Sequence, residues 1–150
     1  MMTPKNLLVL VHVFAMLSWL GAMYFNLTLL FPMYRSRPGK GYADLMQEQG
    51  SRAAPLLYLL IFATGLSGMA LLAIDHTPLN SVWAISKIAC WGLMLACHLY
   101  GSFSIWPRVF LALNEEKNQL FFTYKMSMFT SATAGTVAVL LGYLKNIGIQ

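Results

Sequence analysis

The sequence predicts an all-α integral membrane protein, built as an up-down bundle of four helices. Three observations support this fold class. Hydrophobic residues make up 58% of the 150-residue chain and charged residues only 10%, whereas soluble domains carry roughly 25% charged residues. Four apolar stretches reach the length of about 20 residues that a helix needs to cross hydrocarbon. Short links between them make sequential helices antiparallel neighbours.

The expected helices cover residues 7–33, 53–74, 82–106 and 120–144 of a single domain, 1–150. Helices are expected because backbone groups in lipid must bond within their own segment. Thr3-Pro4 is typical of a helix start, since proline is tolerated at the first helical position. Asn80 or Ser81 can cap the third helix, which is expected to stop near Pro107.

The positively charged residues predict the orientation in the membrane. Most lie in or beside the first and third connections, namely Arg35, Arg37, Lys40, Arg52, Arg108, Lys117 and Lys125, against Lys5, Lys87 and Lys145 on the other side. Because cytoplasmic loops are enriched in Lys and Arg, both termini are expected outside the cytoplasm. The cell membrane of a bacterium, the inner membrane, is the expected location.

The composition also excludes several functions. The basic residues are scattered rather than clustered on one helix, which excludes a nucleic-acid partner. All five carboxylates, Asp44, Glu48, Asp75, Glu115 and Glu116, lie in connections, so a carboxylate proton relay across the membrane is not expected. The expected partners are membrane lipid, a redox partner or larger membrane complex, and further copies of the chain.

The first helix carries a histidine within an otherwise apolar stretch. His12, Met16, Trp19, Met23 and Asn26 recur at spacings of four and three, which places them on one helix face. That face is expected to turn inward, because a histidine and an amide are costly to expose to lipid. His12 is then either a cofactor ligand or a core histidine that bonds a neighbouring helix.

The third helix presents Lys87 and His98 on a shared face. Lys87 lies near the helix start and can extend to the outer interface, whereas His98 lies ~10 Å or more deeper. Lys87 is expected near the level of His12, as is Met69 on the antiparallel second helix. His12 and His98 are therefore not expected to be the two axial ligands of one haem.

Sulfur and small residues form two further patterns. Cys90, Met94 and Cys97 follow one another at spacings of four and three, and soft sulfur ligands suit Cu(I), although a single helical stripe does not easily close around one ion. Small residues recur along the fourth helix and the second, where they are expected to let helices approach closely. They are Ser127, Ser131, Gly135, Ala138 and Gly142, with Thr64 and Gly68.

Two spacings resemble those of a known family. They are H-x6-W-x-G at His12, Trp19 and Gly21, and W-x3-K-x10-H at Trp83, Lys87 and His98, with Ala54-Pro55 and Gly65 on the second helix. The chain thereby resembles the HemJ-type protoporphyrinogen IX oxidases and the related CopD-like membrane domains.

The resemblance implies a haem b site with His12 as a metal ligand and His98 as a second candidate ligand. It also implies that Lys87 acts beside the haem or substrate, and we place Trp19 and Met69 among the cofactor-binding candidates. The expected function is membrane electron transfer or porphyrinogen oxidation, an oxidoreductase activity in the second case. Two alternatives stay open. One is a copper-handling domain, for which His76 beside Asp75 is a further candidate, and the other is a cofactor-free accessory subunit.

Overall fold

The computed structural model describes residues 3–35, 42–112 and 114–147. Its helical elements are α1 (Pro4–Phe25), η1 (Asn26–Leu30), α2 (Phe31–Arg35), α3 (Tyr42–Ile74), α4 (Val82–Leu99), η2 (Tyr100–Ile105), α5 (Trp106–Leu111) and α6 (Asn114–Asn146). Within these ranges no strand occurs. η1 and η2 are π-helical, and each continues without a break into the α-helices that flank it.

Four segments of these helices are long and apolar enough to cross a membrane. They are Pro4–Met33, Gly50–Ile74, Val82–Val109 and Glu116–Lys145. Large apolar side chains cover their outer surface, as Phe14, Leu66 and Val82 show with exposed fractions of 69%, 72% and 81%. Such a surface suits lipid and not water. The predicted all-α integral membrane four-helix bundle is confirmed.

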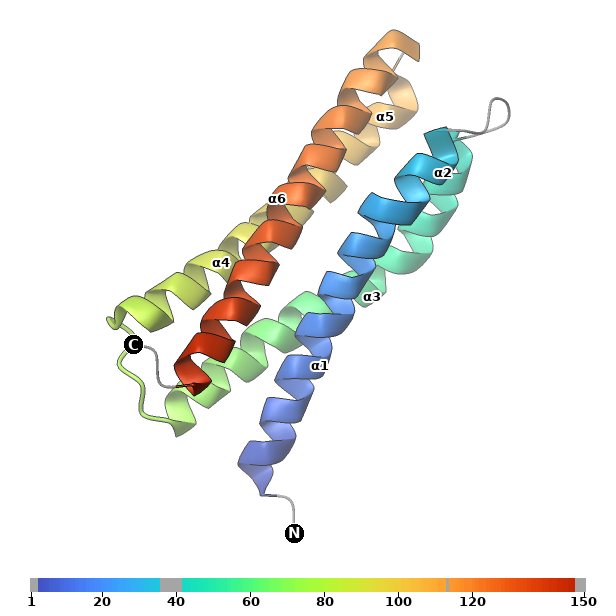
Figure 1. The fold of residues 1–150 in the computed structure, drawn as a ribbon. Coiled ribbons are helices and arrows are strands. Elements are labelled where there is room, and N and C mark those ends of the chain that lie inside the picture. The colour runs from blue at the N-terminus through green and yellow to red at the C-terminus, as the bar shows by residue number, and fades with distance from the viewer. Residues whose placement is uncertain (1–2, 36–41, 113, 148–150) are drawn as a thin grey trace.

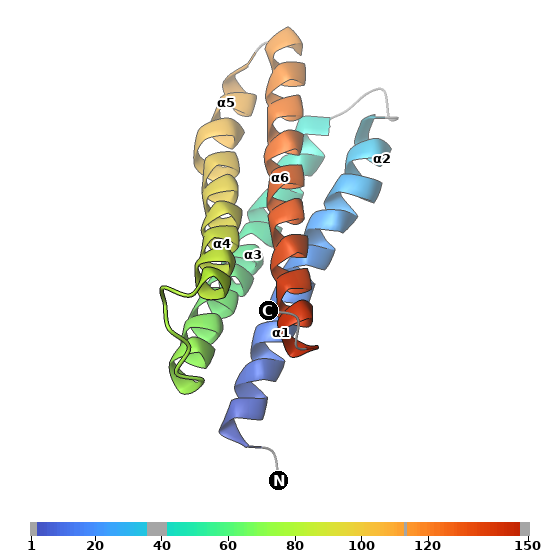
Figure 2. The same ribbon diagram turned by 60° about the vertical axis from the view of Figure 1, so that its left-hand side comes forward.

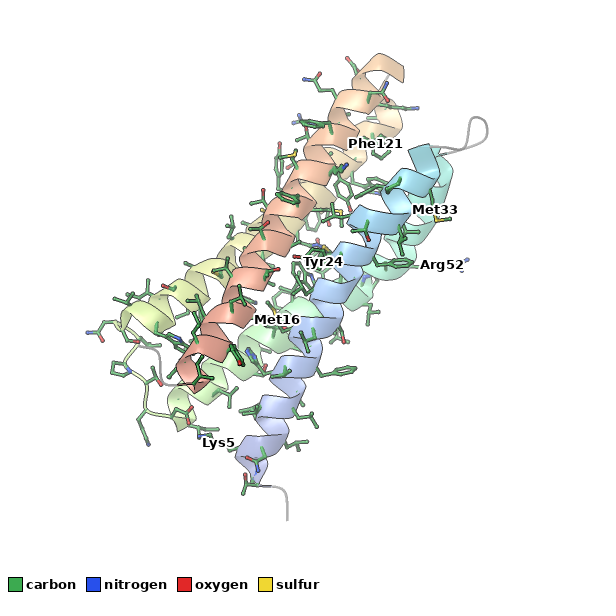
Figure 3. All side chains as sticks on the ribbon, in the orientation of Figure 1. Lys5, Met16, Tyr24, Met33, Arg52 and Phe121 are labelled. Carbon is green, nitrogen blue, oxygen red and sulfur yellow. The ribbon has the colours of Figure 1, made fainter. Side chains whose placement is uncertain are left out.

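The bundle consists of two antiparallel hairpins. α1 packs along α3, and α4 packs along α6, while α6 also contacts α1. Figure 1 and Figure 2 show the two hairpins side by side, with both termini at the end where α3 turns into α4. We call this the termini end, and the end near α2 and α5 the opposite end. Figure 3 places Lys5 at the termini end and Met33 and Arg52 toward the opposite end.

Side-chain caps set two of the helix starts. The hydroxyl of Thr3 accepts a hydrogen bond from the Asn6 amide at 3.2 Å, with Pro4 in the first turn. The hydroxyl of Ser81 accepts from the Ala84 amide at 3.3 Å. Both caps satisfy amides that have no partner within the helix. The expected start of the first helix is confirmed, and Ser81 is the residue that caps the third.

The end of α3 is closed by backbone bonds around His76. The His76 amide donates to the Ala73 carbonyl, and the Thr77 amide donates to the Leu72 carbonyl. These two bonds form the Schellman motif that often ends a helix. His76 has a φ of 48°, in the left-handed region that glycine usually occupies at this position. His76 therefore has a structural role in the turn.

The helices run further than the apolar stretches. α3 begins at Tyr42 and α6 at Asn114, in segments expected to be connections, and the third span continues past Pro107. The added segments "YADLMQEQ" and "NEEKNQ" contain many strong helix formers. Polar helix ends can extend beyond hydrocarbon into water, where hydropathy no longer marks them.

A proline follows each π-helical segment. η1 ends just before Phe31-Pro32, and η2 ends just before Trp106-Pro107. The amides of Phe31 and Trp106 each donate to a carbonyl five residues back, on Asn26 and Gly101. Proline lacks an amide hydrogen and clashes with the carbonyl four residues earlier. The wider π turn relieves that clash while the helix continues.

Indole rings fill spaces that glycines leave open between helices. The Trp91 Nε1–H of α4 donates to the Ile61 carbonyl of α3 at 3.0 Å. A Cβ at Gly65 would lie 2.6 Å from Cε2 and Cζ2 of that indole. Because the hydrogen bond fixes the ring, it cannot move away without cost. Gly65 is therefore required for the close approach of α3 and α4.

We expect Gly65→Ala to destabilise the bundle by about 1–3 kcal/mol, the usual cost of overpacking a core. Gly92→Ala is the matched control, because a Cβ at Gly92 meets nothing within 4 Å. Both substitutions gain helix propensity, so their difference isolates the clash with Trp91. Thermal unfolding in detergent, followed by circular dichroism, measures it. Equal unfolding temperatures for the two variants would contradict this role of Gly65.

Candidate functional site

The inward face predicted for the first helix is confirmed. Met16, Trp19, Met23 and Asn26 are buried, and His12 is half-buried nearer the termini end. The first three belong to the central apolar core of the bundle. The polar end of the Asn26 side chain donates to the Ala22 carbonyl of its own helix. On this face, His12 is a side chain whose polar atoms reach across to another helix.

His12 is anchored to α3 through one ring nitrogen. Its Nδ1 lies 3.0 Å from the Thr64 carbonyl oxygen and 3.0 Å from the Ser67 hydroxyl oxygen. A carbonyl only accepts hydrogen bonds, so Nδ1 carries the proton and Nε2 keeps its lone pair. The Ser67 hydroxyl donates to the Ala63 carbonyl of its own helix and is thus free to accept from His12. No described residue is hydrogen-bonded to Nε2.

Gly68 makes room for the imidazole on α3. A Cβ there would lie 3.0 Å from His12 Cε1. Thr64 and Gly68 were predicted to let helices approach, and here they receive the His12 ring. The histidine's partners Thr64 and Ser67 were not predicted as a binding pair. The run of small residues at 64, 67 and 68, two of them hydroxyl-bearing, was the signal in the sequence.

Two lysines meet one indole at the termini end. The Nζ atoms of Lys87 and Lys145 each lie 4.0 Å from the ring centroid of Trp83. The Trp83 Nε1–H donates to the Leu141 carbonyl at 3.2 Å, which fixes the ring between α4 and α6. A Cβ at Gly142 would lie 3.1 Å from the Lys87 Nζ, so this glycine provides the space for the ammonium. Lys87 thus extends back toward the start of α4.

Lys87 and His12 belong to the same half of the bundle. Lys87 lies against Trp83 and Gly142, near the start of α4 and the end of α6, and His12 lies against Gly68, near the end of α3. Met69 follows Gly68 directly on α3 and is half-exposed. Trp19 lies about two turns deeper than His12 and is fully buried. The structure therefore places Lys87 and His12 in the same half of the bundle and leaves Met69 half-exposed at its surface.

His98 occupies a separate level of the bundle. Its ring packs edge-on against Tyr58 of α3, with 4.9 Å between the ring centroids. His12 contacts α3 six to ten residues further along, at Thr64 to Gly68, which corresponds to about 9–15 Å along the helix. The Nε2 of His98 and the hydroxyl of Tyr58 are both buried without a hydrogen-bond partner among the described residues.

A small cavity of about 10 Å³ adjoins His98. Its walls come from α1, α4 with η2, and α6, and the lining residues are Met23, Cys97, His98, Gly101, Ser102, Tyr124, Ser127, Met128 and Ser131. This volume is close to the minimum that one water molecule needs. The cavity joins residues that are far apart in the sequence, so no pattern along the chain predicts it.

The sulfur stripe of the third helix does not converge on one point. Cys97 lines the cavity, whereas Cys90 and Met94 do not. Met94 is almost fully buried in the apolar core, and both cysteines are free thiols. In the described part of the chain, no group of three or more His, Cys, Asp or Glu side chains is placed to hold a metal ion.

The small residues of α6 contact the neighbouring helices, as predicted. Ser127 and Ser131 donate to the carbonyls of Cys97 and Met94 on α4. A Cβ at Gly135 would lie 3.2 Å from atoms of both Trp19 and Leu20 on α1. α6 therefore packs against α1 and α4 at the level of the cavity.

Comparison with known proteins finds no matching family model, no matching curated protein and no matching solved structure.

An ion pair joins the N-terminal helix to the turn after α3. The Nζ of Lys5 lies 2.5 Å from the Asp75 carboxylate, and both side chains are exposed. The hydrogen bond from Lys5 lowers the pKa of the Asp75 carboxyl below its usual value, and the positive charges of Lys5, Lys145 and His76 act in the same direction. A carboxyl whose pKa is lower in the folded state than in the unfolded state stabilises the folded state at pH values above the unfolded-state pKa. This stabilisation is lost as the pH falls through the folded-state pKa.

We expect the unfolding temperature of the wild type to fall more steeply on acidification, between about pH 5 and pH 2, than that of Asp75→Asn. The other carboxylates are common to both proteins, so the difference reports the Lys5–Asp75 pair. The effect is expected to be small because both groups are exposed. Thermal unfolding in detergent over a pH series measures it, and parallel curves would contradict the pairing.

Proposed function

We propose that this chain is a membrane redox protein that binds haem b with His12 as an axial ligand. The observation that carries the proposal is the hydrogen bonding of the His12 ring. Nδ1 donates to the Thr64 carbonyl and the Ser67 hydroxyl, so the lone pair of Nε2 is available to iron. Metal-binding histidines usually donate their other ring N–H to a carbonyl or carboxylate, which fixes both tautomer and orientation. The resemblance to HemJ-type and CopD-like proteins favours haem as the group bound.

We expect His12 and Lys87 to hold one end of a haem. His12 would supply the axial nitrogen, and the ammonium of Lys87 would offset the charge of a propionate in surroundings of low dielectric constant. The cavity near His98 is far too small for a porphyrin. His98, at another level, would not share that iron.

Bound haem b supplies one-electron transfer, at a potential set by its axial ligand and surroundings. The chain's own contribution is positional. Thr64 and Ser67 hold the imidazole, Gly68 leaves space for it, and Lys87 supplies a positive charge nearby. In a porphyrinogen oxidase the electrons would come from the substrate, and in an electron carrier they would come from a membrane partner or a larger complex.

The hydrogen bonds of His12 also favour a second candidate, a cofactor-free accessory subunit. In that function the bond from Nδ1 to α3 would serve only to join two helices. The two candidates differ in Nε2, which binds iron in the first and no cofactor in the second. A haem protein absorbs visible light and a cofactor-free subunit does not, so a visible spectrum distinguishes the two candidates.

We expect the detergent-purified protein, from cells with sufficient haem, to show a Soret band and a b-type reduced-minus-oxidised spectrum. His12→Ala removes the axial nitrogen and should abolish the band, as counted by pyridine haemochrome. His98→Ala is the matched control and should keep it, because His98 lies at a different level. A colourless wild type would exclude the haem proposal and favour the accessory subunit. Loss of the Soret band in His98→Ala, with the band kept in His12→Ala, would identify His98 and not His12 as the haem ligand.

The excess of Lys and Arg in and beside the first and third connections of the sequence favours both termini outside the cytoplasm, which is the periplasm for a bacterial inner membrane protein. We expect an alkaline phosphatase fusion at the C-terminus to be active and a green fluorescent protein fusion at the same site to be dark. Fusions in the connection 36–41 serve as the opposite control. Bright fluorescence from the C-terminal fusion would reverse the orientation.

A further inference from the structure

We infer that Lys87 and Lys145, both held against the ring of Trp83, bind the phosphate group of an anionic phospholipid at the termini end of the bundle. Lys145 and Trp83 have no part in the proposed haem site, which shares only Lys87 with this one. The lipid site is therefore a second function of this end of the molecule.

The two ammonium groups converge on one indole. Each Nζ lies 4.0 Å from the centroid of the Trp83 ring, so the two charges are no further apart than twice that distance. Lys87 comes from the second turn of α4 and Lys145 from the last turn of α6. The π face of the indole attracts both cations, but the ring is neutral and cannot offset their charge.

Hydrogen bonding and packing fix the inner part of this cluster. The Trp83 Nε1–H donates to the Leu141 carbonyl at 3.2 Å, which joins α4 to α6. Gly142 leaves the space for Lys87, since a Cβ there would lie 3.1 Å from its Nζ. Lys87 is half-buried, whereas Lys145 is exposed. The site thus combines one ammonium in a fixed position with a second at the surface that can adjust to a ligand.

The protein supplies no counter-charge to these lysines among its described residues. Neither Lys87 nor Lys145 has a carboxylate within ion-pairing distance there, and the Asp75 carboxylate of the same end pairs with Lys5. Two like charges at close range repel each other, and surroundings of low dielectric constant strengthen the repulsion. An anion bound to both would replace this repulsion by two attractions.

A phosphate group fits such a pair of ammonium groups. Phosphate oxygens accept charge-assisted hydrogen bonds of about 2.7–2.9 Å from ammonium groups. One phosphate carries several acceptor oxygens, so it can bond two separate donors at once. Lysine binds phosphate as a point charge and needs no fixed planar geometry, which suits the adjustable Lys145 side chain.

The surroundings favour a lipid as the source of the phosphate. Trp83 lies in the first turn of the third span and Lys145 ends the fourth. The cluster therefore lies at the boundary between hydrocarbon and water, where lipid headgroups lie and tryptophan is enriched. Val82 and Tyr143 beside the cluster are largely exposed. Their surfaces offer contacts to the acyl chains of a lipid, which a soluble phosphate lacks.

Native mass spectrometry of the full chain tests the site, with phosphatidylglycerol or phosphatidylcholine added at equal concentration to the detergent. We expect the wild type to retain one phosphatidylglycerol more tightly than phosphatidylcholine, because the choline cation cancels the charge of its own phosphate. Lys145→Met keeps an unbranched stem and removes the charge. It should weaken phosphatidylglycerol binding about fivefold, the effect of one lysine near an anionic lipid, and Lys87→Met should do the same.

Lys125→Met is the matched control, since Lys125 is also an exposed lysine of α6 but lies about 30 Å from Lys145 along the helix. It should leave the affinity for phosphatidylglycerol unchanged, as should His12→Ala. Lys145→Met should in turn keep any Soret band of the wild type. Failure of the haem proposal and failure of the lipid proposal therefore give separate results.

Inorganic phosphate is the second probe, because it has the same oxygens without acyl chains. We expect it not to displace phosphatidylglycerol at equal concentration. Displacement would identify a soluble phosphate compound as the ligand and would overturn the lipid assignment. Equal retention of the two lipids by the wild type, a result that needs no variant to fold, would also overturn it. Equal weakening in Lys125→Met and Lys145→Met would do the same, since it would show attraction by net charge alone.

Discussion

The structure depends on one constraint, namely that every backbone carbonyl and amide in hydrocarbon must find its partner inside the protein. Most hydroxyl side chains satisfy their own hydrogen atoms by donating to the carbonyl one turn back, as Thr28, Thr64 and Thr133 do. Several other side-chain donors bond to carbonyls of a neighbouring helix. Trp83, Trp91 and His12 all do this. Helix pairing here is thus achieved by side chains that use the second lone pair of a carbonyl already bonded within its helix.

The same rule explains why His12 can be both structural and functional. Imidazole has two nitrogens, and one hydrogen bond to Thr64 satisfies only the first. An indole, such as that of Trp91, has a single polar atom and is fully used by its bond to Ile61. Histidine therefore fixes a helix pair while keeping a donor atom available for metal. The requirement to anchor the residue and the requirement to bind a ligand do not compete.

Much of the fold followed from local sequence. Apolar length predicted the four spans, and periodicity predicted that Met16, Trp19 and Met23 face inward, because both depend on one helix at a time. Ser81 could be named as one of two caps for the same reason. The partners across helices could not be predicted. The pairing of His12 with Thr64 and of His98 with Tyr58 depends on the rotation of α3 about its axis. Many weak contacts together determine that rotation. The cavity residues come from three helices and share no signal along the chain.

The π turns before Pro32 and Pro107 have a consequence for helical phase. A residue in an α-helix advances the side-chain direction by about 100°, and a π turn holds one residue more than an α turn. Each proline-bearing tail is therefore rotated relative to the ordinary continuation of its helix. Phe31 and Trp106 reach the Tyr124 ring from opposite hairpins in this rotated setting. The extra residue in η1 and in η2 thus sets the direction of the two rings whose contact with Tyr124 joins the hairpins at the opposite end. Sequence changes that restored a pure α winding would turn both rings away together.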